Sequence, residues 1–139
     1  MDQRVALRHY DLFIDGRYVA PESAEYSIDL DPATEEPIAE VASGSKADVD
    51  KAVSAARAAL PVWGALRAAE RGRILQRAAT LLERHQEEII EIESLDAGKP
   101  LAAVRRQDMA AVIDTVRYYA GWCDKITGQV IPARRTCRR

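Results

Sequence analysis

The fold of this chain is indicated most clearly by residues 45–60, which read SKADVDKAVSAARAAL. Ser45 is a residue type that caps helix N-termini, and Asp48 follows at the position where an acidic side chain can bond back to the cap. Apolar residues then recur every three to four positions from Val49 to Leu60, which indicates one face of a helix. Since proline cannot continue helical hydrogen bonding, the sequence predicts that Pro61 stops this helix.

The residues ahead of this helix carry the short patterns of β-strands. Residues 12–19, LFIDGRYV, place an Asp-Gly pair between two β-favouring flanks, as in a hairpin whose turn needs positive φ. Residues 26–31 and 38–41 alternate apolar with polar side chains, and a proline turn separates them. We therefore expect a β-layer of short strands within residues 12–42, preceded by an N-terminal extension over residues 1–11.

The residues after the proline stop predict further helices. Beyond a connection at residues 63–64, apolar side chains recur at helical spacing over residues 74–95. Gly98 should end this stretch, because glycine enters the left-handed conformation without strain. A third helical stretch covers residues 109–123 and should close at Gly128. The expected fold class is α/β, with a β-layer followed by three to four α-helices.

Length and composition describe one ordinary globular domain. The chain has 139 residues, of which 47% are hydrophobic and 30% charged, and its net charge is -2. This balance gives no field that would attract nucleic acid, and no stretch approaches the ~20 apolar residues of a membrane helix. The N-terminus lacks the apolar core of a signal peptide, so we expect no nucleic-acid partner, no membrane partner and a cytoplasmic setting.

The last six residues carry four arginines. Such a cluster could form an electrostatic patch for phosphate-rich partners. A short basic end without aromatic neighbours is more often a frayed terminus, so residues 133–139 are predicted to be a disordered basic tail.

Two cysteines, Cys123 and Cys137, are candidate nucleophiles. Cys123 falls on the apolar stripe of the third helical stretch, where a thiol fills core space, and we favour that packing role. Cys137 has arginines on both sides that would lower its pKa, but no base accompanies it. We expect both thiols to be reduced and neither to be catalytic.

Residues 87–96 are rich in carboxylates, which could serve acid/base chemistry or hold an ion. We favour a solvated acidic helix face for most of them. Lys99 invites comparison with Schiff-base and phosphate-binding lysines, but its place after Gly98 predicts that it neutralises the carbonyl end of the preceding helix. No glycine-rich phosphate motif occurs in the sequence.

Several short motifs occur in a definite order and spacing. They read LFIDG (residues 12–16), DPAT (31–34), KADVDKAV (46–53), DAGKP (96–100), YYAGW (118–122) and GQVIP (128–132). Taken together, they resemble the N-terminal part of the NAD(P)-dependent aldehyde dehydrogenases over residues 12–132. One departure lies at residues 102–104, where members usually show an acidic residue and this chain has Ala-Ala-Val.

The resemblance implies an oxidoreductase that converts an aldehyde to a carboxylic acid with NAD or NADP. Full-length members are several times longer and keep the nucleophilic cysteine, the general-base glutamate and the dinucleotide-phosphate loop outside the matched stretch. Residues 12–132 would then be the N-terminal part of the cofactor-binding domain, without its dinucleotide-binding parallel sheet. We expect a truncated fragment with no catalytic and no cofactor-binding residue, inactive alone and binding neither cofactor tightly.

The resemblance also implies one ion site. In some aldehyde dehydrogenases the aspartate at the place of Asp96 binds a monovalent cation together with two main-chain carbonyls, which match Asp29 and Leu30 here. K+ or Na+ at this place would join a strand to a helix. The alternative is that Asp96 only caps a helix.

Partners follow from the same resemblance. The aldehyde would bind only the full-length form, which is expected to be a homo-oligomer. The fragment should self-associate, because helix faces such as Met109, Val112, Val116 and Tyr119 would lack the sheet they were built to meet. The alternative is a non-catalytic helical interaction module that binds a full-length relative or another protein.

Overall fold

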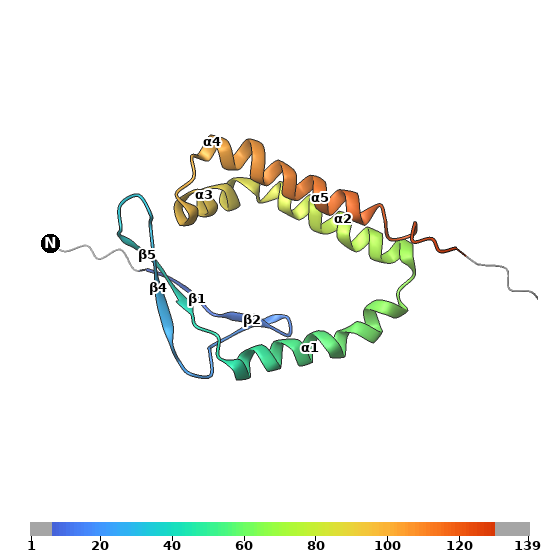
Figure 1. The fold of residues 1–139 in the computed structure, drawn as a ribbon, viewed down its shortest axis with the longest axis horizontal. Helices are drawn as coiled ribbons and strands as arrows, with labels where there is room; N and C mark the ends of the chain where they lie inside the picture. Colours follow the sequence, from blue (N-terminus) through green and yellow to red (C-terminus); the bar gives the residue numbers. More distant parts are fainter. Residues whose placement is uncertain (1–6, 130–139) are drawn as a thin grey trace, which may run out of the picture.

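Strands and helices follow one another in two blocks along the chain (Figure 1). The computed structural model describes residues 7–129. The strands are β1 (Arg8–Tyr10), β2 (Leu12–Ile14), β3 (Arg17–Val19), β4 (Tyr26–Leu30) and β5 (Pro37–Ala42). The helices are α1 (Lys46–Ala65), α2 (Ala68–Arg84), α3 (Gln86–Ala97), α4 (Leu101–Ala103), the π-helical segment η1 (Val104–Met109) and α5 (Ala110–Ala120). The predicted order, a β-layer followed by helices, is confirmed.

The strands form two small sheets in the described part of the chain. β2 pairs antiparallel with β3, and the turn residues Asp15 and Gly16 have φ values of 54° and 76°, as predicted for an Asp-Gly hairpin. The other sheet has the order β1-β5-β4, with β1 parallel and β4 antiparallel to β5. The expected strand range, residues 12–42, omitted β1, because three residues are too few to show alternation and their partner lies far along the chain.

The start of α1 is formed as the sequence predicts. The Ser45 hydroxyl accepts a hydrogen bond from the backbone N–H of Asp48 at 3.3 Å. In return, the Asp48 carboxylate accepts from the backbone N–H of Ser45 at 2.9 Å. Two N–H groups that have no partner within the helix are therefore satisfied by side chains.

The predicted stop of α1 at Pro61 is wrong, because the helix continues through Pro61 to Ala65. A proline removes its own N–H bond, but the residues after it can still donate to the carbonyls before it. The helix ends only at Leu66, whose backbone is extended. The expected connection at residues 63–64 therefore lies inside the last turn of α1.

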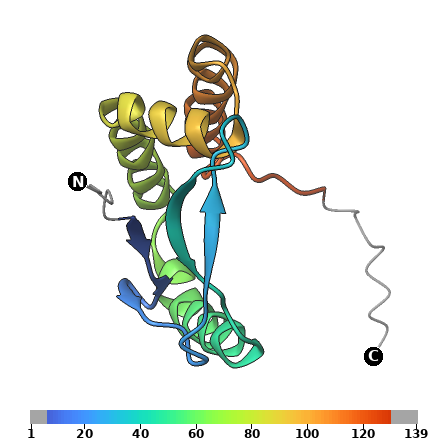
Figure 2. The ribbon, with the colours of Figure 1, turned by 90° about the vertical axis from the view of Figure 1, so that its left-hand side faces the viewer.

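α2 and α5 lie side by side (Figure 1), and Figure 2 shows both on the opposite side of the strands from α1. At one end of their contact, a Cβ added to Gly72 would stand only 3.0 Å from the carbonyl oxygen of Ala120. Ala79 on α2 and Ala120 on α5 are buried as well. Small residues thus let the two helices approach closely.

The apolar core lies where α3, η1 and α5 meet. Ile90, Val104, Met109 and Ile113 form its buried cluster. Val104 and Met109 are five residues apart, which in a regular α-helix would turn their side chains about 140° from each other. The π-helical segment has a wider turn, and in it both residues are buried.

The third helical stretch differs from its prediction at both ends. It begins at Leu101 and ends at Ala120, well before Gly128. Its apolar face is also only partly open: Met109 is buried and Val116 half-buried, whereas Val112 and Tyr119 are exposed. Packing of α5 against α2 thus covers part of this face, and the self-association expected from it stays a prediction.

The remaining helix predictions agree with the structure. The stretch over residues 74–95 is divided at His85 into α2 and α3. If α4, η1 and α5 are taken as one helix, the described residues form four helices, within the expected three to four. Gly98 ends α3 with φ of 64°, as predicted. The predicted tail at residues 133–139, with Cys137, lies outside the described residues. Among residues 7–129, no helix combines the length and apolar character needed to cross a membrane.

Candidate functional site

Two carboxyl groups from different layers meet at one side of the three-stranded sheet. Asp29 lies in β4 and Asp96 in the last turn of α3, and both line a cavity of about 130 Å3. Apolar residues such as Ile92 and Leu95 form much of the remaining wall. Two of the three predicted cation ligands are thus brought together, whereas Leu30 does not line the cavity.

β4 is irregular at the predicted ligands. Its register shifts between Asp29, which pairs with Ala39, and Leu30, which pairs with Pro37. Pro37 has no N–H group and cannot donate to the Leu30 carbonyl across the ladder. The β4–β5 ladder is therefore interrupted at Leu30.

The carboxyl groups of Asp29 and Asp96 interact with each other, and Arg8 lines the same cavity. A hydrogen bond to the Asp29 side chain, followed by desolvation and the charges of Asp29 and Glu93, raises the pKa of Asp96 above its ordinary value of 3.8. Asp96 therefore favours the folded state most when it is protonated. This contribution is complete below the ordinary value and is lost as pH rises through the raised pKa.

The donor set suits a hard cation that takes oxygen ligands. The carboxyl groups of Asp29 and Asp96 could share one ion, which would offset the charge repulsion between them. Within residues 7–129 no group of three His, Cys, Asp or Glu side chains is placed to hold a metal. A cation here would accordingly need main-chain oxygens, as the predicted set of Asp29, Leu30 and Asp96 includes.

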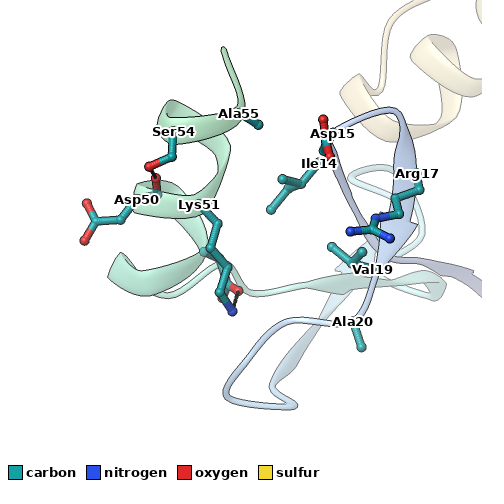
Figure 3. Close-up of a pocket in the computed structure, with 10 residues that line it drawn as sticks. Ile14, Asp15, Arg17, Val19, Ala20, Asp50, Lys51, Ser54 and Ala55 are labelled. Atoms are coloured by element: carbon teal, nitrogen blue, oxygen red, sulfur yellow. Dashed lines mark hydrogen bonds and ion pairs between the residues drawn. The ribbon is translucent and has the colours of Figure 1, made fainter. Parts of the chain in front are cut away.

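A wider cavity of about 590 Å3 separates the β2–β3 hairpin from α1 (Figure 3). Two of its polar side chains are already engaged: the Lys51 ammonium donates to Glu22 at 2.9 Å, and the Ser54 hydroxyl donates to the Asp50 carbonyl at 2.7 Å. The hydrogen bond to Glu22 raises the pKa of Lys51, so this lysine stays protonated at neutral pH and is a poor nucleophile. The cavity is the space where the β2–β3 hairpin meets α1.

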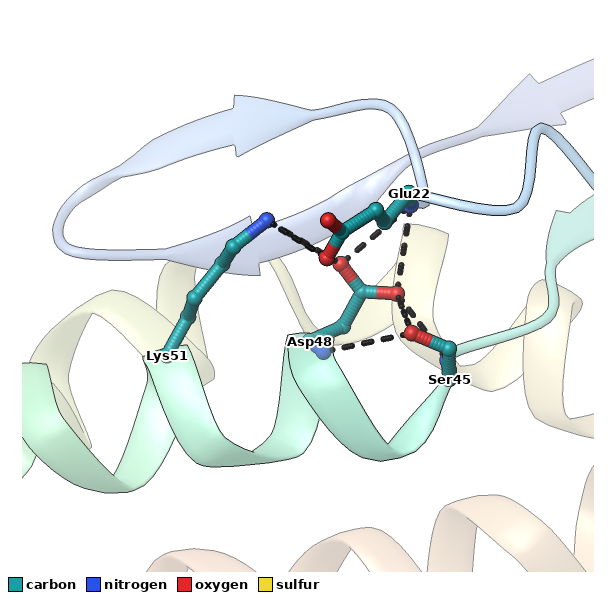
Figure 4. A network of polar contacts seen from close by, with 4 residues as sticks. All are labelled: Glu22, Ser45, Asp48 and Lys51. Atoms are coloured by element: carbon teal, nitrogen blue, oxygen red, sulfur yellow. Dashed lines mark hydrogen bonds and ion pairs between the residues drawn. The ribbon is translucent and has the colours of Figure 1, made fainter.

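Asp48 fastens α1 to the loop that follows β3 (Figure 4). Its buried carboxylate accepts from the Ser45 hydroxyl at 2.7 Å and, through both oxygens, from the Glu22 backbone N–H at 3.2 Å. The Ser45 hydrogen bonds are the main cause that lowers the pKa of Asp48 below its ordinary value. The sequence predicted the cap, but it carried no signal for the bond to Glu22.

Cys123 has the packing role that the sequence favours. It is half-buried, and its Sγ lies 3.7 Å from the Tyr119 carbonyl of its own helical turn. Its Cβ lies 3.8 Å from the place a Cβ on Gly72 would take, which puts it against the start of α2. No base is among these contacts.

Lys99 does not neutralise the carbonyl end of α3 as expected. Its ammonium instead binds the carboxylates of Glu93 at 3.0 Å and Asp108 at 2.8 Å, and so joins α3 to η1. Glu87 likewise forms an ion pair with Arg105. The acidic run is thus only partly a solvated face, since Glu93 binds Lys99 in the connection after α3 and Glu87 binds Arg105 in η1.

The fold can now be compared with known proteins. A sequence model of the aldehyde dehydrogenase family matches residues 18–139. The chain belongs to the aldehyde dehydrogenase family. The resemblance carried by the DAGKP and YYAGW motifs is thereby confirmed.

Curated relatives are much longer than this aldehyde dehydrogenase chain. Cytosolic 10-formyltetrahydrofolate dehydrogenase of Mus musculus is 44% identical over 125 residues, which cover 88% of this chain and 14% of the relative. Retinal dehydrogenase 2 of Homo sapiens is 43% identical over 129 residues, covering 91% of this chain and 25% of the relative. The chain therefore spans a quarter or less of the length of these relatives.

Solved aldehyde dehydrogenases share the fold of this segment. The NAD+ complex of the Bacillus cereus enzyme matches with a TM-score of 0.88 and 37% identity, over 92% of this chain and 26% of that one. PnpE from Pseudomonas sp. WBC-3 matches with a TM-score of 0.88 and 39% identity, over 91% of this chain and 26% of that one. The arrangement of the β-layer and helices is thus that of the N-terminal segment of the family.

Proposed function

We propose that this chain is the N-terminal framework of an enzyme that oxidises an aldehyde to a carboxylic acid with NAD+ or NADP+, and that it has no turnover by itself. The observation that carries the proposal is the likeness to solved family members, which covers 92% of this chain but only 26% of the Bacillus cereus enzyme. The NAD+ bound to that enzyme supports NAD as the cofactor of the intact form.

The residues of this chain do not fit a dinucleotide. The sequence has no glycine-rich phosphate motif, and the described sheets consist of three and two short strands. Cys123 packs against α2 and has no base beside it, so it does not fit the role of an activated nucleophile. We assign no step of hydride transfer to these residues.

Purified chain should form no NADH or NADPH when supplied with acetaldehyde, benzaldehyde or betaine aldehyde, because the groups that bind cofactor and attack the aldehyde are not among its residues. The measurement is the absorbance of reduced cofactor, with an intact aldehyde dehydrogenase as positive control and a tag-only preparation as background. Cys123→Ser should give the same trace as the unchanged chain. Aldehyde-dependent reduction above background would contradict the proposal.

A non-catalytic interaction module is the second candidate, and the exposure of α1 favours it. Val49, Leu60 and Val62 on this helix are more than half exposed. Apolar side chains gathered on one element are typical of a surface that meets another protein. Stoichiometric binding of the chain to an intact aldehyde dehydrogenase, without turnover of its own, would favour this second function.

We further propose that Asp96 and the main-chain carbonyls of Asp29 and Leu30 hold K+ or Na+ and so join α3 to β4. The support is the meeting of Asp29 with Asp96, the raised pKa of Asp96 and the irregular register of β4 between Asp29 and Leu30. The role of such an ion is structural, since it would offset repulsion between two carboxylates of different layers.

Thermal stability at neutral pH should therefore be higher in KCl or NaCl than in a salt of a bulky organic cation at equal ionic strength. Melting followed by circular dichroism should show an increase of a few degrees, and Asp96→Ala should abolish it. Glu91→Ala is the matched control, because Glu91 is an exposed carboxylate of the same helix and its loss should leave the cation response intact. A cation response that persists in Asp96→Ala would remove the site.

A further inference from the structure

The two faces of β1 have different neighbours. Successive side chains of a strand point to opposite faces of a sheet. Arg8 and Tyr10 line the cavity of the candidate cation site. His9 lies between them in sequence and is paired in register with Glu40 of β5, so these two side chains share the other face of the sheet. This other face has no part in the candidate site.

His9 stands between two carboxylates. Its Nδ1 is 3.3 Å from Oε2 of Glu40, and its Nε2 is 3.4 Å from Oδ1 of Asp11. Asp11 follows His9 by two residues, and in an extended chain this spacing places both side chains on the same side. Within residues 7–129, His9 is the only basic side chain that pairs with either carboxylate. The ring is therefore the single link between the two acids.

Tyr26 of β4 completes the cluster. Its ring centroid is 4.4 Å from that of His9, and its hydroxyl donates to the same Oδ1 of Asp11 at 2.7 Å. The hydrogen bond to Asp11 is the main cause that raises the pKa of Tyr26 above its ordinary value of 10.0. Tyr26 therefore remains a donor throughout the neutral range. The cluster joins β1, β4, β5 and the connection between β1 and β2.

The protonation state of His9 decides how many of these contacts can form. A neutral imidazole has one N–H group, whereas the imidazolium has two. Both nitrogens of His9 face a carboxylate oxygen at the same time, so only the imidazolium can donate to Asp11 and Glu40 together. In the neutral ring, one nitrogen would turn its lone pair toward a carboxylate. The cluster is therefore strongest with a protonated ring.

The direction of the pH dependence follows from this count of donors. Histidine is the side chain that ordinarily changes its charge between about pH 5 and 8, a range in which carboxylates as a class stay ionised. The contribution of the cluster is present while the ring of His9 carries both protons. It is lost as pH rises through the range in which the ring gives up one of them.

We propose that His9 holds β1 to the sheet in a pH-sensitive manner: the protonated ring binds both Asp11 and Glu40, and loss of one proton frees one of these carboxylates and loosens β1. Since Arg8 and Tyr10 of the same strand line the candidate cation cavity, a loosened β1 also loosens one wall of that cavity. The inference does not require a bound cation, because the contacts of His9 lie on the opposite face of the strand.

The test is amide exchange of the 139-residue chain measured by NMR at about pH 6 and about pH 8. Protection factors are taken relative to the unfolded-chain rate at each pH, and the buffer contains only a bulky organic cation, so that the candidate cation site cannot contribute. Protection of the amides that join β1 to β5 should fall about two- to tenfold from the lower to the higher pH, as expected for the loss of exposed ion pairs. Amides of α2 should keep their protection.

Three variants separate His9 from other causes. His9→Gln should show at both pH values the lower protection of the unchanged chain at about pH 8, because glutamine cannot gain a charge. Glu40→Gln leaves one carboxylate and should reduce the fall by about half. His85→Gln is the matched control and should keep the whole response, since His85 faces a single carboxylate, that of Glu88, at 4.0 Å. Equal protection of β1 at both pH values in the unchanged chain, or a fall that persists in His9→Gln, would overturn the proposal.

Discussion

Ile90→Ala is expected to lower the melting temperature of the chain more than any other single truncation of an apolar side chain considered for it. Ile90 is wholly buried, at 0% exposure, in the cluster with Val104, Met109 and Ile113. Removing a buried isoleucine side chain leaves a cavity and costs about 2–5 kcal/mol. Small domains are stable by only about 5–15 kcal/mol, so the loss is a large part of the total.

The measurement is thermal unfolding followed by circular dichroism. A loss of this size corresponds to a decrease of about 7–17 °C for a chain of this length. Ile92→Ala is the control, since Ile92 lies on the same helix and is 39% exposed. Equal melting temperatures for the two variants would show that the cluster around Ile90 is not the core of the helical layer.

Asp48→Ala should release α1 from the rest of the chain. The change removes the acceptor of the Ser45 and Glu22 hydrogen bonds, which leaves the first turn of α1 uncapped and the loop after β3 unbound. We expect the melting temperature to fall by about 2–7 °C. Amide exchange in α1 should accelerate at least about tenfold, while the buried amides of α3 change little.

Asp50→Ala is the matched variant, because Asp50 lies in the same part of α1 but bonds only the exposed Lys46. The α1 amides of Asp50→Ala should exchange at the same rate as those of the unchanged chain. The effect of Asp48 should also depend on pH: since its pKa is lowered, its stabilisation is present above the ordinary value of 3.8 and is lost as pH falls through the lowered value. Equal amide-exchange rates of α1 in Asp48→Ala and Asp50→Ala would contradict the role of Asp48 in holding α1 to the loop after β3.

Features set by local chemistry were predictable from the sequence. The Asp15-Gly16 turn, the Ser45 cap and the Gly98 helix end each depend on a few neighbouring residues, and the structure confirms all three. Pro61 misled the prediction because its local effect, one lost N–H bond, is smaller than the tendency of the following residues to complete the helix. β1 was missed because its partner strand lies about thirty residues further on.

The candidate site was likewise only partly predictable from local sequence. Asp29 and Asp96 were chosen through the family resemblance, and their meeting across two layers is not visible in either local pattern. The distribution of exposed apolar residues also depends on tertiary packing. The sequence shows amphipathic stripes on two helical stretches, but it does not show that α5 packs against α2 while apolar residues of α1 stay exposed.

The strand order β1-β5-β4 determines when β1 can pair while the chain is being synthesised. β5 is the last strand to be made but occupies the middle of the sheet, so β1 has no partner when it leaves the ribosome. His9 pairs with Glu40, which is added 31 residues later. At about 5–20 residues per second, the N-terminal strand waits some 2–6 s before it can pair. During that interval the backbone N–H and C=O groups of β1 have no partner strand and are accessible to chaperones. The strand order therefore affects how long the newly made chain can be bound before its sheet forms.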